Sequence, residues 1–155
     1  MRRAPACFLL FFVIAVPDCR CSKSSPEERV RQAIDTVVKA VNERQLKPVI
    51  AAISDQYSDD DGQTKEQLVG YVRAQFILRQ NLYLVVKLSS LECPEPAKAK
   101  VVAFAAMAAT SGGVLPDLRN LSADVYRFDI RMADEDGVWR VVGADWTPAT
   151  VKDLL

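Results

Sequence analysis

Carboxylates and tyrosines are the side chains of this sequence that could do chemistry, because histidine is missing from it. The 155 residues include no histidine and four cysteines, none of them in a Cys-x-x-Cys pair. Zinc or iron sites built on imidazole are therefore excluded, and a site built on thiolates alone lacks ligands. The acidic run Asp59-Asp60-Asp61-Gly62 lacks the alternating ligands and distant glutamate of an EF-hand calcium loop. We interpret this run as a solvated turn, and we expect neither a metal nor a cofactor.

Residues 1–18 have the pattern of a secretory signal peptide. Arg2-Arg3 precede the uninterrupted apolar run Cys7–Val16, which is shorter than the ~20 residues that span a bilayer. Cys19 follows at the place where bacterial lipoproteins carry a lipidated cysteine, although Asp18 departs from the small residue usual before it. We expect an exported protein, periplasmic or anchored to the membrane of the cell envelope through a lipid on Cys19. Simple secretion and a retained apolar anchor are the alternatives.

Residues 19–25 are predicted to be a linker, and residues 26–155 a single domain. Positive and negative charges balance at 20 each and are interleaved, which argues against nucleic acid as a partner. Cys21 and Cys93 could form a disulfide in an oxidising compartment. An unpaired Cys93 is the other interpretation.

Three helices are expected in the first half of the domain. Ser25-Pro26-Glu27-Glu28 has the residues of a capping box with proline at the first helical position, and this helix should run to about Arg44. A short helix over Leu46–Ile53 follows. Thr64-Lys65-Glu66-Gln67 is a second capping box, and it begins a helix whose inner side carries Leu68, Val69, Val72, Phe76 and Ile77.

Four strands are expected in the second half. Leu82–Leu91 and Lys98–Thr110 are strand-like, with a turn at Glu92–Pro96, and Ser111–Pro116 is a loop. From Asp124 to Met132 the residues alternate between apolar and polar, which is typical of a half-buried strand. Asp136-Gly137 predicts a hairpin turn, and the return strand runs from Trp139 to Trp146. We expect Trp139, Val141 and Asp145 to share a face of that strand.

Three helices followed by four antiparallel strands predict an α+β domain. This order resembles the nuclear transport factor 2-like superfamily, which includes ketosteroid isomerase-like and SnoaL-like proteins, over roughly Glu27 to Trp146. Three features carry the resemblance: the short second helix followed by Ile53-Ser54-Asp55-Gln56-Tyr57, the Asp-rich loop leading into a capped helix, and the hairpin Asp136–Val141 that ends at Trp146. The resemblance implies helices packed in the concave side of a strongly curved sheet, as a cone.

The resemblance also implies a pocket, but no particular reaction, because the fold hosts isomerases, dehydratases, cyclases and binding domains. Its enzymes often use a histidine–aspartate pair, which this sequence cannot supply, or a tyrosine with acids. Asp145 and Tyr57 are the candidates for the second arrangement, and a paired structural acid is the competing interpretation. We expect Tyr57, Tyr71, Phe76 and Trp146 to line a ligand pocket.

The strand around Ala103–Ala109 is apolar on both faces, so both faces should be covered. The helices would cover one face. A second copy of the chain, forming a homodimer through the sheet, or a lipid-like partner would cover the other, unless residues 114–121 fold back over it. The overall hypothesis is a non-catalytic envelope domain that binds a small apolar ligand or a protein partner. An isomerase or hydro-lyase and a purely structural module are the alternatives.

Export and lipidation can be tested with Cys19→Ser. If Cys19 is lipidated, this variant should leave the membrane fraction and accumulate unprocessed, because the lipid that anchors it cannot be attached. Fractionation of cells that express each form measures both effects. Equal membrane retention of variant and wild type would contradict lipidation, and unprocessed wild-type protein in the soluble cytoplasm would contradict export.

Overall fold

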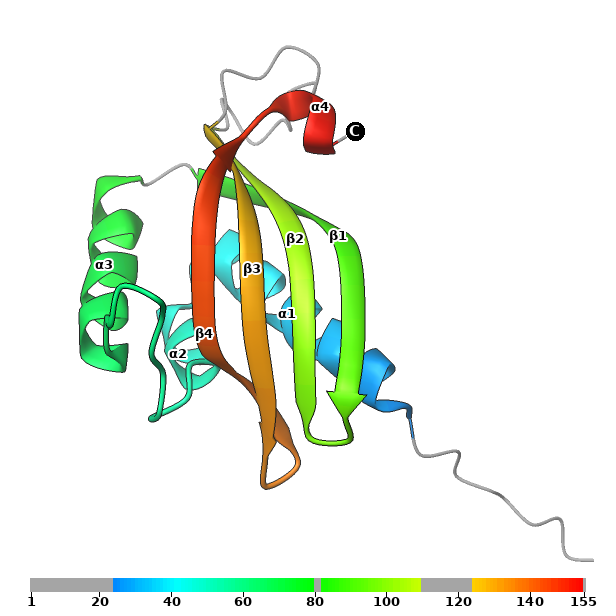
Figure 1. Ribbon diagram of the computed structural model, residues 1–155. Helices are drawn as coiled ribbons and strands as arrows, with labels where there is room; N and C mark the ends of the chain where they lie inside the picture. The colour runs from blue at the N-terminus through cyan, green and yellow to red at the C-terminus, as the bar shows by residue number, and fades with distance from the viewer. Residues whose placement is uncertain (1–23, 80–81, 110–123, 155) are drawn as a thin grey trace, which may run out of the picture.

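The computed structural model of the protein describes residues 24–79, 82–109 and 124–154. The elements in these ranges are α1 (Pro26–Asn42), α2 (Leu46–Ala51), α3 (Lys65–Leu78), β1 (Leu82–Glu95), β2 (Lys98–Ala109), β3 (Asp124–Glu135), β4 (Val138–Ala149) and α4 (Val151–Leu154). The strands form one antiparallel sheet in the order β1-β2-β3-β4, which α1 crosses from behind while α2 and α3 lie beside β4 (Figure 1). The expected α+β cone is confirmed.

The expected signal peptide, Cys19, Cys21 and the loop Ser111–Pro116 lie outside the described residues. None of the helices in the described ranges is long and apolar enough to cross a membrane.

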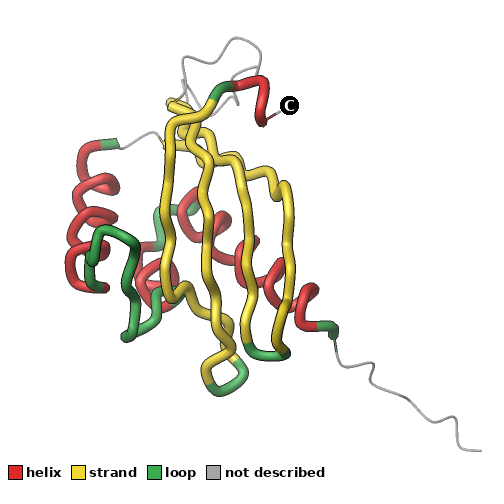
Figure 2. Tube along the Cα trace, in the orientation of Figure 1, coloured by secondary structure: helices red, strands yellow, loops and turns green. Residues whose placement is uncertain are grey.

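The sheet is two long hairpins joined edge to edge, and both hairpin turns lie at the same end of the sheet (Figure 2). The β3–β4 turn is at the expected place, where Asp136 and Gly137 have φ of 55° and 84°. Strand β1 is longer than predicted and continues to Glu95, whereas β2 begins at Lys98 as expected. The turn expected over Glu92–Pro96 is therefore only two residues long.

Helix α1 begins at the predicted capping box. The Ser25 hydroxyl accepts a hydrogen bond from the Glu28 N–H at 3.2 Å, and the Glu28 carboxylate accepts one from the Ser25 N–H at 3.0 Å. The helix ends at Asn42, before the expected Arg44, which has a left-handed φ of 58°. The Asn42 carboxamide then donates to the Leu84 carbonyl at 3.1 Å and accepts from the Leu84 N–H at 2.7 Å. These two bonds fix the end of α1 to the edge strand β1.

The chain after α2 pairs with the edge of β4. The Val141 N–H donates to the Ala52 carbonyl at 2.8 Å, and the Ser54 N–H donates to the Val141 carbonyl at 2.9 Å. Ile53 thus forms a parallel bridge with Val141, and α2 stops at Ala51, earlier than the expected Ile53. This pairing holds the start of the Asp-rich loop against the sheet.

Strand β4 contains one extra residue opposite β3. Arg131 pairs with Gly143 and Met132 pairs with Val141, so Val142 has no partner in the register. Such a bulge reverses the alternation of side chains beyond it. Asp145 pairs with Asp129 on the outer face, and the prediction that it shares a face with Trp139 and Val141 is wrong.

The short helix α4, which the sequence pattern did not predict, covers part of the outer face of the sheet. Its residue Leu154 forms a buried cluster with Ala106 of β2 and Val125 of β3. The alanine-rich strand is therefore covered on both faces there, as expected, but the outer cover is the end of the chain. The competing segment, residues 114–121, lies outside the described residues.

The main core cluster joins α1 to the lower part of the sheet. Val30 of α1 is fully buried against Val101 of β2 and Trp139 of β4, and Trp139 is only 4% exposed. The guanidinium of Arg29 lies over the Trp139 ring at 5.7 Å. The Trp139 indole therefore joins the first helix to the last hairpin.

Trp139→Ala should lower the free energy of unfolding by ~3–5 kcal/mol, the cost of truncating a buried tryptophan. That is a large part of the roughly 5–15 kcal/mol that stabilises a domain. Urea denaturation followed by circular dichroism measures the change, and Trp139→Phe, which keeps a ring in place, should lose less. A Trp139→Ala protein as stable as the wild type would contradict the assignment of Trp139 to the core.

Candidate functional site

Two apolar cavities lie inside the cone, between the helices and the concave face of the sheet. The first, of about 240 Å³, is walled by α3 and the upper parts of the strands, and we name it the α3 chamber. The second, of about 210 Å³, is walled by α1 and the lower parts of the strands, and we name it the α1 chamber. Leu84 of β1 and Phe128 of β3 line both. These two side chains form the partition between the chambers.

The chambers lie end to end along the central strands. On β3, Tyr126 and Phe128 line the α3 chamber, and Phe128, Ile130 and Met132 line the α1 chamber. At about 3.3 Å per residue, the wall from Tyr126 to Met132 is roughly 20 Å long. On β2, Met107 belongs to the α3 chamber, whereas Ala103 and Ala105 belong to the α1 chamber.

The two chambers differ in polarity. The polar side chains on the wall of the α3 chamber are Tyr71, Gln75 and Tyr126, and Tyr71 is 51% exposed, so this chamber reaches the surface. The α1 chamber is aliphatic apart from Phe128, Met132 and Trp139. The indole Nε1 of Trp139 is buried and has no hydrogen-bond partner among the described residues.

The described lining residues carry neither acid nor base. Every side chain named on either wall is uncharged, and the titratable groups are the hydroxyls of Tyr71 and Tyr126. These walls can desolvate an apolar molecule and offer it a few hydrogen bonds, but a group that could move a proton at neutral pH is not among them.

Three of the four residues expected to line a pocket come together in the α3 chamber: Tyr71, Phe76 and Trp146. Tyr71 stacks on Trp146 with ring centroids 6.4 Å apart, and Trp146 in turn lies 6.3 Å from Phe128. Trp146 faces inward because the bulge at Val142 reverses the alternation of β4. Ile77, expected on the inner side of α3, is instead 73% exposed.

The fourth residue, Tyr57, lies elsewhere. It is 3% exposed and packs with Ile53 and Val69, away from both chamber walls. Its hydroxyl donates to the Ala144 carbonyl at 3.2 Å and lies 3.4 Å from the Asp59 carboxylate. Burial, followed by the nearby charge of Asp59, raises the pKa of Tyr57 to about 12. At neutral pH this phenol holds its proton, and it does not meet a ligand inside the cone.

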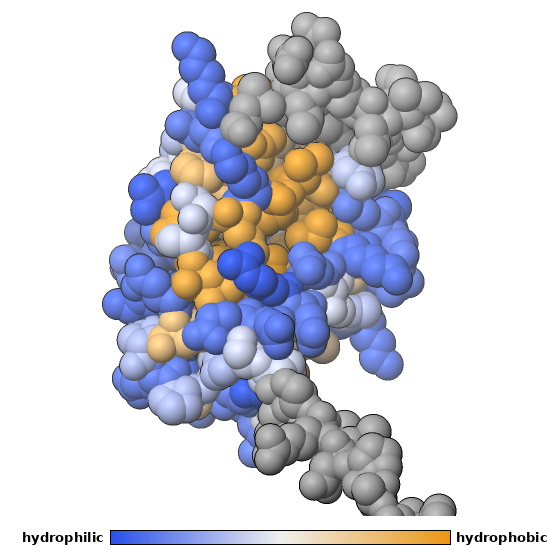
Figure 3. Space-filling model, turned by 90° about the vertical axis from the view of Figure 1, so that its right-hand side faces the viewer, coloured by the Kyte–Doolittle hydropathy of each residue, from blue (hydrophilic) through white to orange (hydrophobic). Residues whose placement is uncertain are grey.

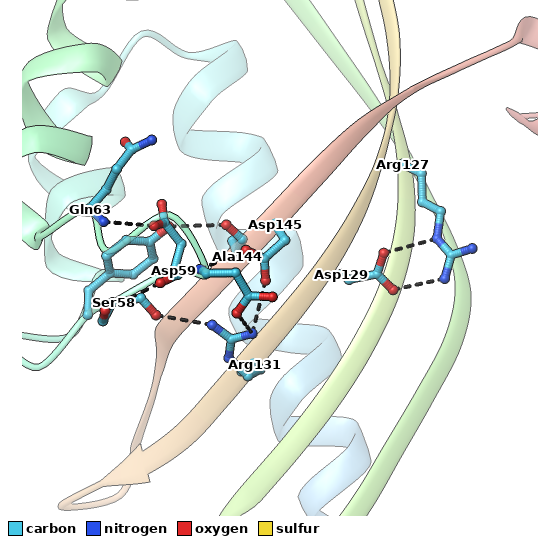
Figure 4. Close-up of polar contacts among 10 residues, drawn as sticks. Ser58, Asp59, Gln63, Arg127, Asp129, Arg131, Ala144 and Asp145 are labelled. Atoms are coloured by element: carbon cyan, nitrogen blue, oxygen red, sulfur yellow. Dashed lines mark hydrogen bonds and ion pairs between the residues drawn. The ribbon is translucent and has the colours of Figure 1, made fainter.

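Asp145, the other catalytic candidate, is held by an arginine on the outer face. Arg131 donates to the Asp145 carboxylate at 2.9 Å, to Asp60 at 3.2 Å and to the Ser58 carbonyl at 3.1 Å (Figure 4). The other oxygen of Asp145 accepts the Asp60 N–H at 3.0 Å. Arg131 needs the space left by Gly143, because a Cβ there would stand 2.7 Å from the Arg131 Nε and 2.7 Å from the Ser58 oxygen. The competing interpretation of Asp145, an acid paired with an arginine, therefore describes its geometry.

The Asp-rich loop turns through its own backbone. The Asp59 carboxylate accepts the Gln63 N–H at 2.8 Å, and Gly62 adopts a φ of 74°. Asp60 is bound to Arg131. No group of three or more potential ligands within the described ranges is arranged to hold a metal ion. The contacts that the structure shows for this loop are those of a turn that is bound to the sheet through Arg131.

Cys93 is a free thiol within the described part of the chain, and its possible partner Cys21 lies outside it. Burial raises the pKa of Cys93, and the neighbouring Glu27 raises it further. Its thiol is therefore a poor nucleophile.

Sequence reasoning missed Leu84, Gln75, Tyr126 and Phe128 as pocket residues. Tyr126 and Phe128 stood on the predicted apolar face of β3, where such a pattern indicates core. The signal that could have found them is the difference in side-chain size between neighbouring strands. The aromatic rings of Tyr126 and Phe128 pair with Ala105 and Ala103 in the β2–β3 register. A wall that combines large and very small side chains leaves room between them.

Hydrophobic residues also reach the surface. On the side of the molecule that carries β1, they gather in one area in the upper half, bordered by hydrophilic residues (Figure 3). At the end of α3, Ile77 and Leu78 are 73% and 76% exposed. These residues leave apolar surface in contact with water.

No family model matches the chain, and neither does any curated protein. Solved structures do match. A nuclear transport factor 2-like protein from Shewanella oneidensis superposes with a TM-score of 0.63 at 12% identity, over 78% of this chain and 98% of that one. A scytalone dehydratase-like protein from Novosphingobium aromaticivorans gives 0.63 at 8% identity, over 79% and 83%. A ketosteroid isomerase-like protein from Erwinia carotovora gives 0.59 at 12% identity, over 83% and 99%.

The chain has the nuclear transport factor 2-like fold. The resemblance drawn from the sequence is confirmed at this level. Because the identities are low, these structures establish the architecture and leave the activity to be argued from the chambers.

The environment of Tyr57 predicts a pH dependence of stability. Its pKa rises from 10 to about 12 on folding, so between these values the unfolded chain loses the proton that the folded chain keeps. Stability from Tyr57 should be complete below pH 10 and fall as pH rises towards 12, by up to ~1.4 kcal/mol per pH unit. Urea unfolding of wild type and Tyr57→Phe across this range measures it. Identical slopes for the two proteins would contradict the prediction, and Tyr71→Phe, an exposed tyrosine, is the matched control.

Proposed function

We propose that the protein binds a small apolar ligand inside the cone and does not transform it. The observation that carries this proposal is that the side chains of the described residues leave two apolar cavities in the interior. Phe128 and Ile130 point to the concave side of the central strand β3, yet both remain partly accessible. Cavities of this kind, apolar with a few polar groups, are typical ligand sites.

The volumes suit a ligand of modest size. An engineered apolar cavity of roughly 150 Å³ is known to bind benzene, and each chamber is larger, at about 240 and 210 Å³. The described side chains on their walls are uncharged and favour a neutral ligand, since a buried charge without a partner is costly.

The alternative function is an isomerase or hydro-lyase that uses an acid and a tyrosine. The fold-level likeness to ketosteroid isomerase-like and scytalone dehydratase-like proteins favours it. The positions of the side chains favour binding, because Asp145 is paired with Arg131 outside the cone and Tyr57 is packed away from both chambers. Gln75 and the tyrosines of the α3 chamber can orient a ligand, but they are weak acids and bases.

We infer that this binding takes place in the cell envelope, on the basis of the signal-like pattern of residues 1–18 and of Cys19. A homodimer through the sheet and a protein partner also remain proposals. The charged pair Arg127–Asp129, with 2.9 Å between its nearest atoms, lies on the outer face below the part that α4 covers. A second copy would therefore meet mainly polar residues at this position.

Binding can be measured with N-phenyl-1-naphthylamine, an uncharged apolar dye whose fluorescence rises when it leaves water. The full-chain protein should bind it saturably. Val72→Phe, which adds bulk to the wall of the α3 chamber, should weaken binding at least about ten-fold, the effect of losing two buried methylene-sized groups. Val138→Phe makes the same change at a 49% exposed position of the β3–β4 hairpin and should leave binding unchanged.

Absence of saturable binding, or an equal loss in both variants, would contradict a ligand site in the cone. Native mass spectrometry of the purified protein would identify a co-purifying molecule. If the protein converted that molecule into an isomer or a dehydrated product, and Asp145→Asn abolished the conversion, the enzymatic alternative would replace the proposal.

A further inference from the structure

We propose that the ligand is an elongated, uncharged hydrocarbon chain with one polar end, and that it lies across both chambers. The inference rests on the proposed function and adds the shape and orientation of the ligand. Its polar end lies in the α3 chamber beside Gln75 and its tail lies in the α1 chamber. Leu84 and Phe128, which form the partition, set how far the chain can reach.

The arrangement of the chambers favours an elongated hydrocarbon chain as the ligand, in preference to a compact ring system. They follow one another along β3 for the roughly 20 Å between Tyr126 and Met132. Among the described residues, two side chains, Leu84 and Phe128, line both chambers. A compact molecule could use one chamber at a time. A flexible chain can pass Leu84 and Phe128 and bury apolar surface in both.

The distribution of polar groups sets the orientation. Gln75, Tyr71 and Tyr126 line the α3 chamber, which reaches water at the half-exposed Tyr71. The α1 chamber offers aliphatic walls from α1 and from Val86 of β1. A polar group buried there would meet one unpartnered donor, the indole Nε1 of Trp139, against the three polar side chains of the α3 chamber. A hydrocarbon tail needs no such partner and gains free energy by leaving water.

The alanines of β2 give the tail its room. Ala103 and Ala105 are 3% and 7% exposed and form the floor of the α1 chamber. Their partners on β3 are the larger Phe128 and Tyr126. Ala105→Leu should therefore fill the part of the α1 chamber next to the partition and shorten the space for the tail.

The test uses the straight-chain primary alcohols from hexanol to tetradecanol, with displacement of the naphthylamine dye as readout. In the wild type, affinity should rise about four-fold for each added methylene, which corresponds to its transfer from water, and level off when both chambers are filled. In Ala105→Leu the rise should stop at a shorter chain, so that the longest alcohols lose roughly ten-fold, the value of about two methylenes. Hexanol should bind both proteins equally.

The matched control is Ala74→Leu, the same change at an exposed position of α3. It should leave the whole series unchanged. Thermal unfolding shows whether Ala105→Leu is folded, and because the added side chain enters an existing cavity we expect no loss of melting temperature. Ala103→Leu is the second variant, and in it the affinity should also stop rising at a shorter alcohol than in the wild type.

The two tryptophans, which are the only ones in the sequence, report where the chain lies. Trp146 lines the α3 chamber and Trp139 the α1 chamber. In Trp146→Phe, a long alcohol brominated at its last carbon should quench the fluorescence of Trp139, whereas a short brominated alcohol should not. In Trp139→Phe, the short one should quench Trp146.

Failure of the inference can be told apart from failure of the proposed function. If the wild type binds neither dye nor alcohol, the proposed function is wrong. If it binds the dye but affinity stops rising at hexanol, if Ala105→Leu weakens all chain lengths equally, or if a compact polycycle such as adamantanol binds more tightly than every chain, the inference is wrong and the ligand site stands.

Discussion

The extra residue in β4 determines which side chains enter the cone. Before Val142 the strand directs Trp139 and Val141 to the α1 chamber, and after it the strand directs Trp146 to the α3 chamber. Without the bulge, the ordinary alternation of a strand would turn Asp145 inward and Trp146 outward. The same bulge places Gly143 where Arg131 passes, and Arg131 binds the Asp-rich loop to the sheet. One backbone irregularity thus keeps the interior apolar and the ion pairs outside.

The polar cluster around Arg131 acts mainly through geometry. Ion pairs at such exposed positions contribute about 0–1 kcal/mol each, and Arg131 is 41% exposed as a side chain. Its contribution is to hold residues 58–60 against β4, beside the parallel bridge between Ile53 and Val141. The loop in turn leads into α3, whose inner residues form the wall of the α3 chamber. The outer network therefore positions the inner site without contacting it.

The sequence predicts those parts of the fold that follow from local patterns. The capping box at Ser25, the alternation from Tyr126 to Met132 and the Asp136-Gly137 turn each depend on neighbouring residues, and the structure shows all three. Asp145 was predicted on the wrong face because a single unpaired residue, Val142, reverses the alternation of β4. The residues around Val142 carry no sequence pattern that predicts a bulge. The prediction that Tyr57 lines the pocket is wrong because its hydroxyl bonds to the Ala144 carbonyl, which lies 87 residues away in the sequence. Local patterns give no information about such a distant partner. Helix α4 has four residues, too few to show a helical period.

The chambers themselves could not be predicted, since a cavity is a property of several elements at once. Side chains that line such a space lack the packing contacts that a filled core would give them, and each lost contact lowers the stability of the fold. Water cannot restore these contacts in the α1 chamber, because the described side chains there offer it almost no hydrogen-bond partners. An apolar ligand can, and its binding then adds directly to the stability of the fold. Ala103 and Ala105 are the small side chains that leave this room in the α1 chamber, where a leucine or valine would fill it.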